Sequence, residues 1–122
     1  MNNSSPSKNV ILIKSQDFAC RVVKAQKYLV EEKHERRMSD QLCRSGTSIA
    51  ANVSEAQYAQ SKADFIAKMQ IALKEANESK NWLEILYRTD YIDKVVFESI
   101  YADIIEIIRL LTSILNSAKK KC

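Results

Sequence analysis

Apolar residues recur at helical spacing along the chain, and the first such stretch predicts a helix from Ser15 to about Arg36. Ser15 is the expected N-cap. Asp17 then lies in the first turn, where a carboxylate meets the positive end of the helix. The apolar stripe of this helix contains Phe18, Val22, Ala25 and Leu29.

The second predicted helix runs from Ser39 to about Ala59 and is rich in small side chains. Small side chains allow a neighbouring backbone to come close, so we expect this helix to pack tightly on more than one side. Gly46 inside a helix costs about 1 kcal/mol relative to Ala, and close packing would offset that cost. The apolar line of this helix contains Leu42, Ile49, Val53 and Ala56.

Ser61 and Asp64 form a capping box, in which the hydroxyl and the carboxylate each cover a free backbone N–H at a helix start. They predict a third helix from Lys62 to about Arg88. After a short link, Asp93 is the expected N-cap of a fourth helix that reaches about Ser117. The main apolar stripes contain Phe65, Met69, Ala72, Ala76, Leu83 and Tyr87 in the third helix and Phe97, Ile100, Tyr101, Ile104, Ile108, Leu111 and Leu115 in the fourth.

The third and fourth helices carry more apolar surface than a single stripe needs. Large exposed apolar patches are uncommon on soluble monomers, so the surplus predicts a subunit interface. The alternative is that Trp82 and its neighbours cover the short links. The predicted interface contains Ile71, Trp82, Ile85, Val96, Ile107 and Ile114.

Four helices joined by short links predict an all-α fold, an up-down-up-down antiparallel four-helix bundle. One Gly and one Pro in 122 residues exclude most β-rich and Gly-loop folds, whose turns need these residues. The length fits a single domain over residues 1–122. We expect a flexible tail at residues 1–9 and a basic tail at residues 118–122.

The cysteines predict a reducing, cytoplasmic location. Cys20, Cys43 and Cys122 are odd in number and lack C-x-x-C spacing, which argues against a disulfide framework or a zinc site. The sequence shows no signal peptide and no run of 18 apolar residues, so we expect no membrane span.

The sequence offers no set of residues for catalysis, so we expect no enzymatic activity, no metal and no cofactor. His34 is the single histidine and lies in a charged run that is typical of a solvated helix end. Glu31 and His34 match the Glu-x-x-His spacing of di-iron bundles once, whereas such a site needs two copies. Arg44 could lower the thiol pKa of Cys43, but no histidine is near in sequence, so a structural thiol is favoured.

The net charge of +4 indicates some affinity for polyanions, and the lysines at positions 119–121 supply most of it. Besides that tail, basic residues cluster on one side of the first helix and around the first link. These are the candidate phosphate contacts: Lys14, Arg21, Lys24, Arg36, Arg37 and Arg44.

A line of polar residues follows the second helix beside its apolar stripe: Ser45, Ser48, Asn52 and Glu55. Polar groups at a core boundary are costly unless they are hydrogen-bonded. The favoured interpretation is a satisfied network that sets the helix register. The alternative is a small polar pocket or a contact with a partner.

Four segments resemble one family: QLCRSGTSIAANVSEA at 41–56, SKADF at 61–65, ALKEANES at 72–79 and WLEIL at 82–86. The resemblance is to the bacterial four-helix-bundle proteins, also called intervening-sequence proteins after the inserts in 23S rRNA genes that encode some of them. It covers about Val10 to Leu115. The family's signature positions are Arg44, Ser45, Ser48, Asn52 and Glu55, followed by Lys74, Glu75 and Trp82.

The resemblance implies a ring-like homopentamer. A related protein, the accessory variability protein of diversity-generating retroelements, is a basic pentamer that binds nucleic acid and a reverse transcriptase, and most family members have no known enzymatic activity. Two hypotheses follow. The first is a non-enzymatic oligomer whose basic rim binds RNA or DNA, and the second is a scaffold for a protein partner, such as a reverse transcriptase, without nucleic-acid binding.

Overall fold

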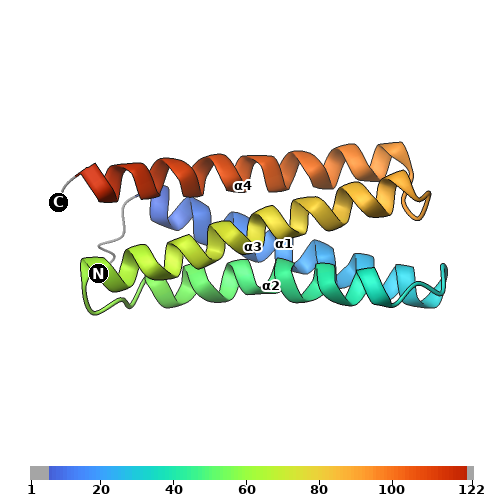
Figure 1. The fold of residues 1–122 in the computed structure, drawn as a ribbon, viewed down its shortest axis with the longest axis horizontal. Helices are drawn as coiled ribbons and strands as arrows, with labels where there is room; N and C mark the ends of the chain where they lie inside the picture. The colour runs from blue at the N-terminus through green and yellow to red at the C-terminus, as the bar shows by residue number, and fades with distance from the viewer. Residues whose placement is uncertain (1–5, 121–122) are drawn as a thin grey trace.

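Four helices joined by short links form an antiparallel bundle in the computed structural model, which describes residues 6–120 (Figure 1). The helices are α1 (Pro6–Glu31), α2 (Arg37–Ala56), α3 (Lys62–Arg88) and α4 (Lys94–Lys120). Within that range the structure contains no strand. The predicted all-α four-helix bundle is therefore confirmed, while residues 1–5 and 121–122 of the predicted tails lie outside the described residues.

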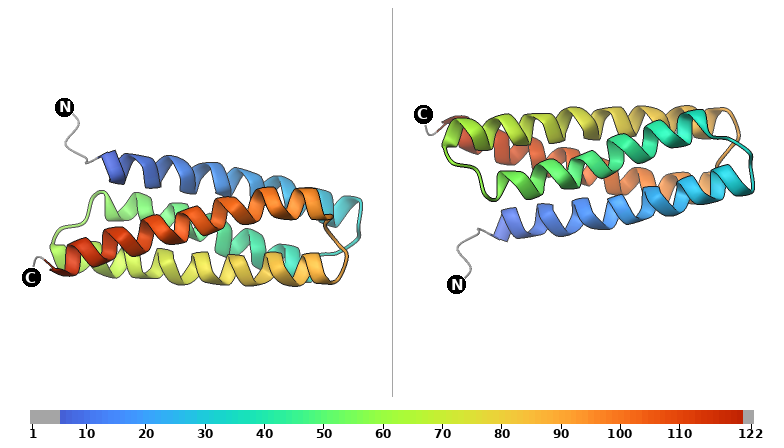
Figure 2. Two further views of the ribbon diagram at one scale, coloured as in Figure 1. Left: turned by 90° about the horizontal axis from the view of Figure 1, so that it is seen from above. Right: turned by 90° about the horizontal axis from the view of Figure 1, so that it is seen from below.

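The helices pack in a ring, with α2 against α1 and α3, and α4 against α3 and α1. The α1–α2 and α3–α4 links lie at one end, which we call the link end (Figure 1). From there α1 and α4 separate toward the opposite end (Figure 2). One continuous core lies between the helices, and its largest fully buried side chains include Phe18, Leu29, Leu42, Ile49, Met69, Leu83, Ile104 and Leu111.

The first helix begins nine residues earlier than predicted, at Pro6 instead of Ser15. Proline is well tolerated in the first turn of a helix, where its missing N–H has no intrahelical acceptor. Ser15 is fully buried inside the helix, and its hydroxyl donates to the carbonyl of Leu12 at 3.0 Å. Residues 6–9 are thus helical and were wrongly predicted as part of a tail.

Glu35 organises the link between α1 and α2, a role that the sequence analysis did not foresee. Its backbone N–H donates to the carbonyl of Leu29 at 2.9 Å. Its carboxylate accepts from the backbone N–H groups of Met38 and Ser39, both at 2.9 Å. The cap of α2 is therefore the Glu35 carboxylate, and the predictions of Ser39 as N-cap and of a first helix reaching Arg36 were wrong.

The predicted starts of the third and fourth helices are confirmed. The Ser61 hydroxyl accepts from the Asp64 N–H at 3.0 Å, while the Asp64 carboxylate accepts from the Gln60 N–H at 3.4 Å. At α4, the Asp93 carboxylate accepts from the Val96 N–H at 2.9 Å. The helix then continues through Lys120, so residues 118–120 belong to α4 and not to a tail.

Gly46 marks the closest approach of α2 to α1. A Cβ at this position would lie 2.6 Å from Cγ2 of Val22 and 3.1 Å from its Cγ1. Val22 is fully buried, and its branched side chain is stiff about χ1, so it cannot easily turn away. The only glycine of the chain therefore serves helix packing, as the small side chains of α2 predicted.

We expect Gly46→Ala to lower the free energy of unfolding by up to about 2 kcal/mol. Alanine gains about 1 kcal/mol in helix propensity, but overpacking a filled core costs about 1–3 kcal/mol. Urea unfolding measures the difference. A double-mutant cycle with Val22→Ala is the control, because removing the Val22 methyl groups should make Gly46→Ala harmless. An increased stability of the single variant, or equal effects of Gly46→Ala with and without Val22→Ala, would contradict the contact.

Candidate functional site

Two of the four segments that carry the family resemblance, residues 41–56 and 72–79, meet along the seam between α2 and α3. Ser45 and Ser79 are both fully buried there, and their hydroxyl oxygens lie 2.8 Å apart. Each hydroxyl also lies near a carbonyl of its own helix, that of Leu42 for Ser45 at 3.3 Å and that of Glu75 for Ser79 at 2.9 Å, so one hydroxyl can donate across the seam while the other donates within its helix. The contact between the two hydroxyls forms only in this alignment of α2 and α3, so it favours the observed register of the two helices.

Arg44 extends this seam to the surface. Its guanidinium contacts Glu75 at 3.3 Å and binds Glu78 through a second nitrogen. Glu78 in turn accepts from the indole N–H of Trp82 at 3.2 Å. The hydrogen bond from Arg44 is the main reason that the pKa of the Glu78 carboxyl lies below its usual range, and the Trp82 N–H acts in the same direction.

The remaining polar residues of α2 do not continue this arrangement. The Asn52 amide donates to the Ser48 carbonyl at 2.9 Å and to its hydroxyl at 3.2 Å. Glu55 is exposed and forms an ion pair with Lys68 at 2.9 Å. Within residues 10–120 no buried side-chain polar atom lacks a partner. The line therefore consists of three separate, satisfied pairings, which supports the structural interpretation over a polar pocket.

Three of the six candidate phosphate contacts are held by carboxylates. Lys14 pairs with Glu106 of α4 at 3.1 Å, and Arg21 pairs with Asp103 at 2.8 Å and also donates to Ser99. Arg44 is bound as described above. The antiparallel topology thus places the basic side of α1 against the acidic part of α4. These three residues do not form a free basic surface.

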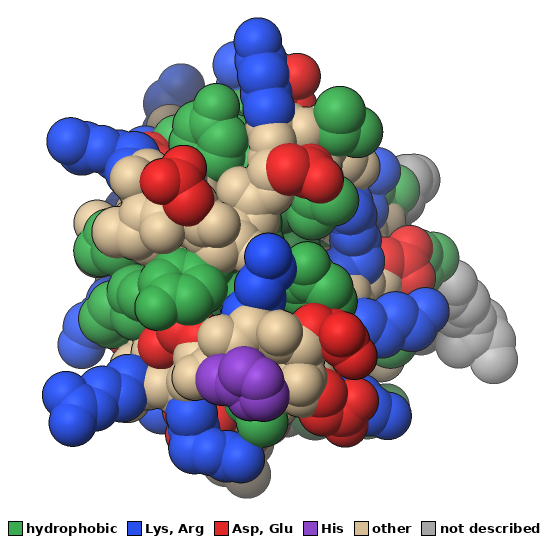
Figure 3. Space-filling model, turned by 90° about the vertical axis from the view of Figure 1, so that its right-hand side faces the viewer, with side chains coloured by type: hydrophobic (Ala, Val, Ile, Leu, Met, Phe, Trp, Pro, Cys, Tyr) green, Lys and Arg blue, Asp and Glu red, His purple; other side chains and the backbone are tan. Residues whose placement is uncertain are grey.

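The other three candidates are exposed, and no carboxylate in the described part of the chain pairs with them: Lys24, Arg36 and Arg37. Arg36 and Arg37 lie at the start of α2, and Lys33 is exposed nearby in the same link. Figure 3 faces this end of the bundle and shows Lys and Arg side chains around its margin, with Asp and Glu side chains between them.

The predicted interface residues differ widely in exposure. Ile107 is only 1% exposed and belongs to the core, so its assignment to a subunit interface was wrong. Trp82, Ile85 and Ile114 are half-buried. Ile71 is exposed on α3 and Val96 on α4. The surplus apolar surface is thus partly absorbed by the core of a single chain, because α4 packs against two neighbours.

An apolar groove of about 520 Å³ lies between α1 and α4 at the link end. Ala25 and Ile100 lie among its lining, and Tyr28 and Val96 remain 47% and 46% exposed. Lys24 and Arg21 line the α1 side and Asp93 the α4 side. This groove cannot be predicted from the sequence, because it arises from the spacing of two helices that are distant in the chain.

His34 and Cys43, the residues considered for chemistry, belong to no group that could hold a metal ion among the described residues. His34 is exposed in the α1–α2 link with a backbone φ of 56°, in the left-handed region that histidine adopts more readily than most residues. Burial first, and then Asp40, raise the pKa of the Cys43 thiol, which favours the unreactive form. Among residues 10–120 no three His, Cys, Asp or Glu side chains lie close enough together to hold a metal ion. In the described range no helix is long and apolar enough to cross a membrane.

The chain is similar to known proteins over most of its length. The family described as 23S rRNA-intervening sequence protein matches residues 7–113. A solved structure of a protein with unknown function, from the S23 ribosomal protein family of Bacteroides thetaiotaomicron VPI-5482, is 55% identical and superimposes with a TM-score of 0.89. That similarity covers 90% of this chain and 98% of the other. No curated protein matches the sequence.

We expect Arg44→Gln to raise the pKa of Glu78 toward its ordinary value of 4.5, with Trp82 keeping it partly lowered. A lowered carboxyl pKa stabilises the fold above that ordinary value, and the contribution disappears as the pH falls through the folded-state pKa. The variant should thus lose less than about 1 kcal/mol at pH 7, as is typical of exposed ion pairs, and nothing at pH 2.

An NMR titration of the Glu78 carboxyl, together with urea unfolding at both pH values, measures these effects. Arg21→Gln is the matched control, because it removes an ion pair from the α1–α4 seam and should leave the titration of Glu78 unchanged. If Glu78 titrates at the same pH in Arg44→Gln as in the unaltered protein, Arg44 does not hold this carboxylate.

Proposed function

The chain belongs to the 23S rRNA-intervening sequence protein family, and from this premise we propose that it is a non-enzymatic assembly protein that binds RNA or DNA through the link end of its bundle. The observation that carries the proposal is the distribution of ion pairs. Cations on the long α1–α4 and α2–α3 seams are neutralised by carboxylates. Arg36 and Arg37, together with Lys24 and Lys33, have no carboxylate partner in the described range.

Unpaired arginines suit a phosphate backbone for a simple reason. Each guanidinium presents several N–H donors that match phosphate oxygens, and binding releases counterions from the nucleic acid. Arg36 and Arg37 are adjacent and exposed at the start of α2. A catalytic role has no support among the described residues, and a cytoplasmic location stays a prediction from the cysteines.

We further propose that copies of the chain associate through the α1–α4 groove, in keeping with the homopentamer that the family resemblance implies. The groove exposes an aromatic and a branched aliphatic side chain, Tyr28 and Val96, at its edge. Aromatic residues are enriched in interface cores. An oligomer would also multiply the net charge of +4, so that five copies carry +20 and attract a polyanion more strongly.

We expect the unaltered protein to bind a structured RNA or a DNA duplex with an affinity that falls steeply with salt. Arg36→Gln/Arg37→Gln removes two phosphate contacts and should reduce the slope of log affinity against log salt by about 1.5. Fluorescence anisotropy over a series of salt concentrations gives both slopes.

Lys62→Gln/Lys74→Gln is the control, because it removes the same charge from exposed positions on α3 and should change the slope much less. Equal effects of the two double variants would show that only net charge matters. An unaltered protein that binds neither RNA nor DNA at low salt would overturn the proposed function. Partners that survive nuclease treatment of a native lysate would then favour the protein-scaffold alternative.

Adjacent valines allow a sharp test of the groove. Val96→Glu places a carboxylate in the groove and should reduce the mass measured by light scattering toward that of one chain. Val95→Glu is the matched control, since Val95 is 78% exposed, does not line the groove and should leave the mass unchanged. A monomeric unaltered protein would contradict association, and an equal response of both variants would place the interface elsewhere.

A further inference from the structure

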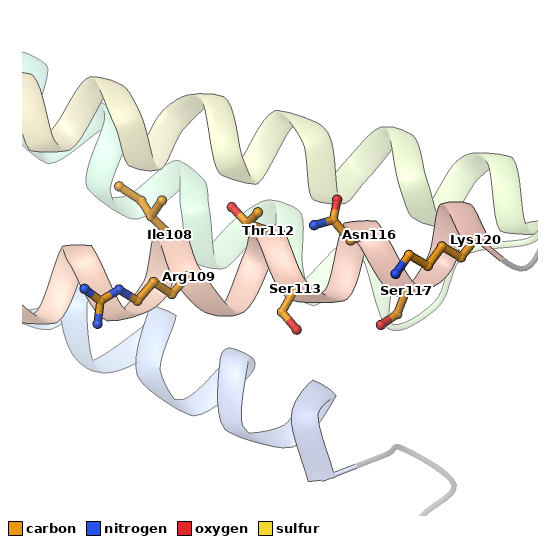
Figure 4. Close-up of a pocket in the computed structure, with 7 residues that line it drawn as sticks. All are labelled: Ile108, Arg109, Thr112, Ser113, Asn116, Ser117 and Lys120. Carbon is orange, nitrogen blue, oxygen red and sulfur yellow. The ribbon is translucent and has the colours of Figure 1, made fainter.

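The C-terminal half of α4 presents a polar face that the sequence analysis did not identify. Seven residues line a shallow hollow of about 490 Å³ on this face. They fall on two neighbouring i, i+4 rows of the helix, so their side chains project side by side. The rows are Ile108, Thr112, Asn116 and Lys120, and Arg109, Ser113 and Ser117 (Figure 4).

The chemistry of these residues favours an anion. The hollow combines two cations with three hydroxyls and one amide, and no acidic side chain lines it. Residues 107–120 contain no Asp or Glu at all. The last carboxylate before them is Glu106, which is already paired with Lys14 of α1.

These side chains are free to bind a ligand. All the polar residues of the hollow are exposed, and within the described range none of their side chains forms a hydrogen bond or an ion pair. Figure 4 shows Arg109, Ser113 and Ser117 on the side of α4 that faces α1, and Thr112 and Asn116 on the side that faces α3. Figure 2 shows that α1 diverges from α4 toward this end of the bundle.

We infer that this face of α4 binds the phosphodiester backbone of a nucleic-acid strand, at a site distinct from the link end. Eleven residues separate Arg109 from Lys120, which is about 16 Å along a helix. Arg109 and Lys120 are therefore far enough apart to contact different phosphates of one strand. Arg109 and Lys120 contact phosphate oxygens, and the hydroxyls and the amide between them donate to phosphate and sugar oxygens.

The inference rests on the proposed function, so its test separates the two sites. An RNA hairpin and a DNA hairpin of the same sequence are titrated into the full chain at low salt, and backbone amide NMR shifts are followed in α4 and in the α1–α2 link. We expect shifts over residues 108–120. In anisotropy experiments, Arg109→Gln/Lys120→Gln should reduce the salt slope by about 1.5. The neutral variant Thr112→Val/Ser113→Ala/Ser117→Ala should weaken binding severalfold with the slope unchanged.

Each outcome decides between the sites. An unaltered protein that binds neither hairpin overturns both proposals. If binding depends on Arg36 and Arg37 while α4 shows no shifts and neither α4 variant has an effect, only the α4 inference fails. Shifts in α4 that appear with phosphatidylserine vesicles or with poly-glutamate, but not with either hairpin, also overturn it. Circular dichroism confirms that each variant keeps its helices.

Discussion

The close approach of α2 to both of its neighbours is the constraint on which the rest of this bundle depends. On one side, Gly46 leaves just enough room for the Val22 side chain of α1. On the other, the Ser45 and Ser79 hydroxyls meet inside the core at 2.8 Å. Larger side chains at these points would force the helices apart, because a packed core has little free volume. At this separation and register Arg44 reaches across to the carboxylates of α3.

The same packing decides which charges are available to a partner. Antiparallel neighbours bring the basic side of α1 against the acidic part of α4, and Arg44 against two glutamates, so the long seams are internally neutralised. Cations without a carboxylate partner in the described range include Arg36 and Arg37 at the link end and Arg109 and Lys120 on α4. The proposed function therefore depends on surface electrostatics and assembly. The described residues offer no cleft in which acid, base and nucleophile converge.

Local signals in the sequence predicted much of the fold. Ser61 and Asp93 were identified as caps because their side chains act on backbone groups only three residues away. Ser15 and Ser39 resemble caps in the sequence but are buried within helices. Ser15 is not a cap because α1 already begins at Pro6. Ser39 is not a cap because the Glu35 carboxylate caps α2. The core stripes were predicted well. Ile107 was misplaced because the number of neighbours that cover a helix cannot be deduced from its own periodicity.

The sequence by itself determined the helical class, the four segments, the small-residue character of α2 and the family. Periodicity, capping and motif spacing involve residues that are close in the sequence, so they can be recognised without knowing how the helices pack. Only the tertiary structure decided which cations are free, where the α1–α4 groove lies and which face of α4 is left uncovered. These features depend on contacts between residues that are distant in the sequence, such as Arg21 and Asp103, and the packing of the helices decides which of these residues meet.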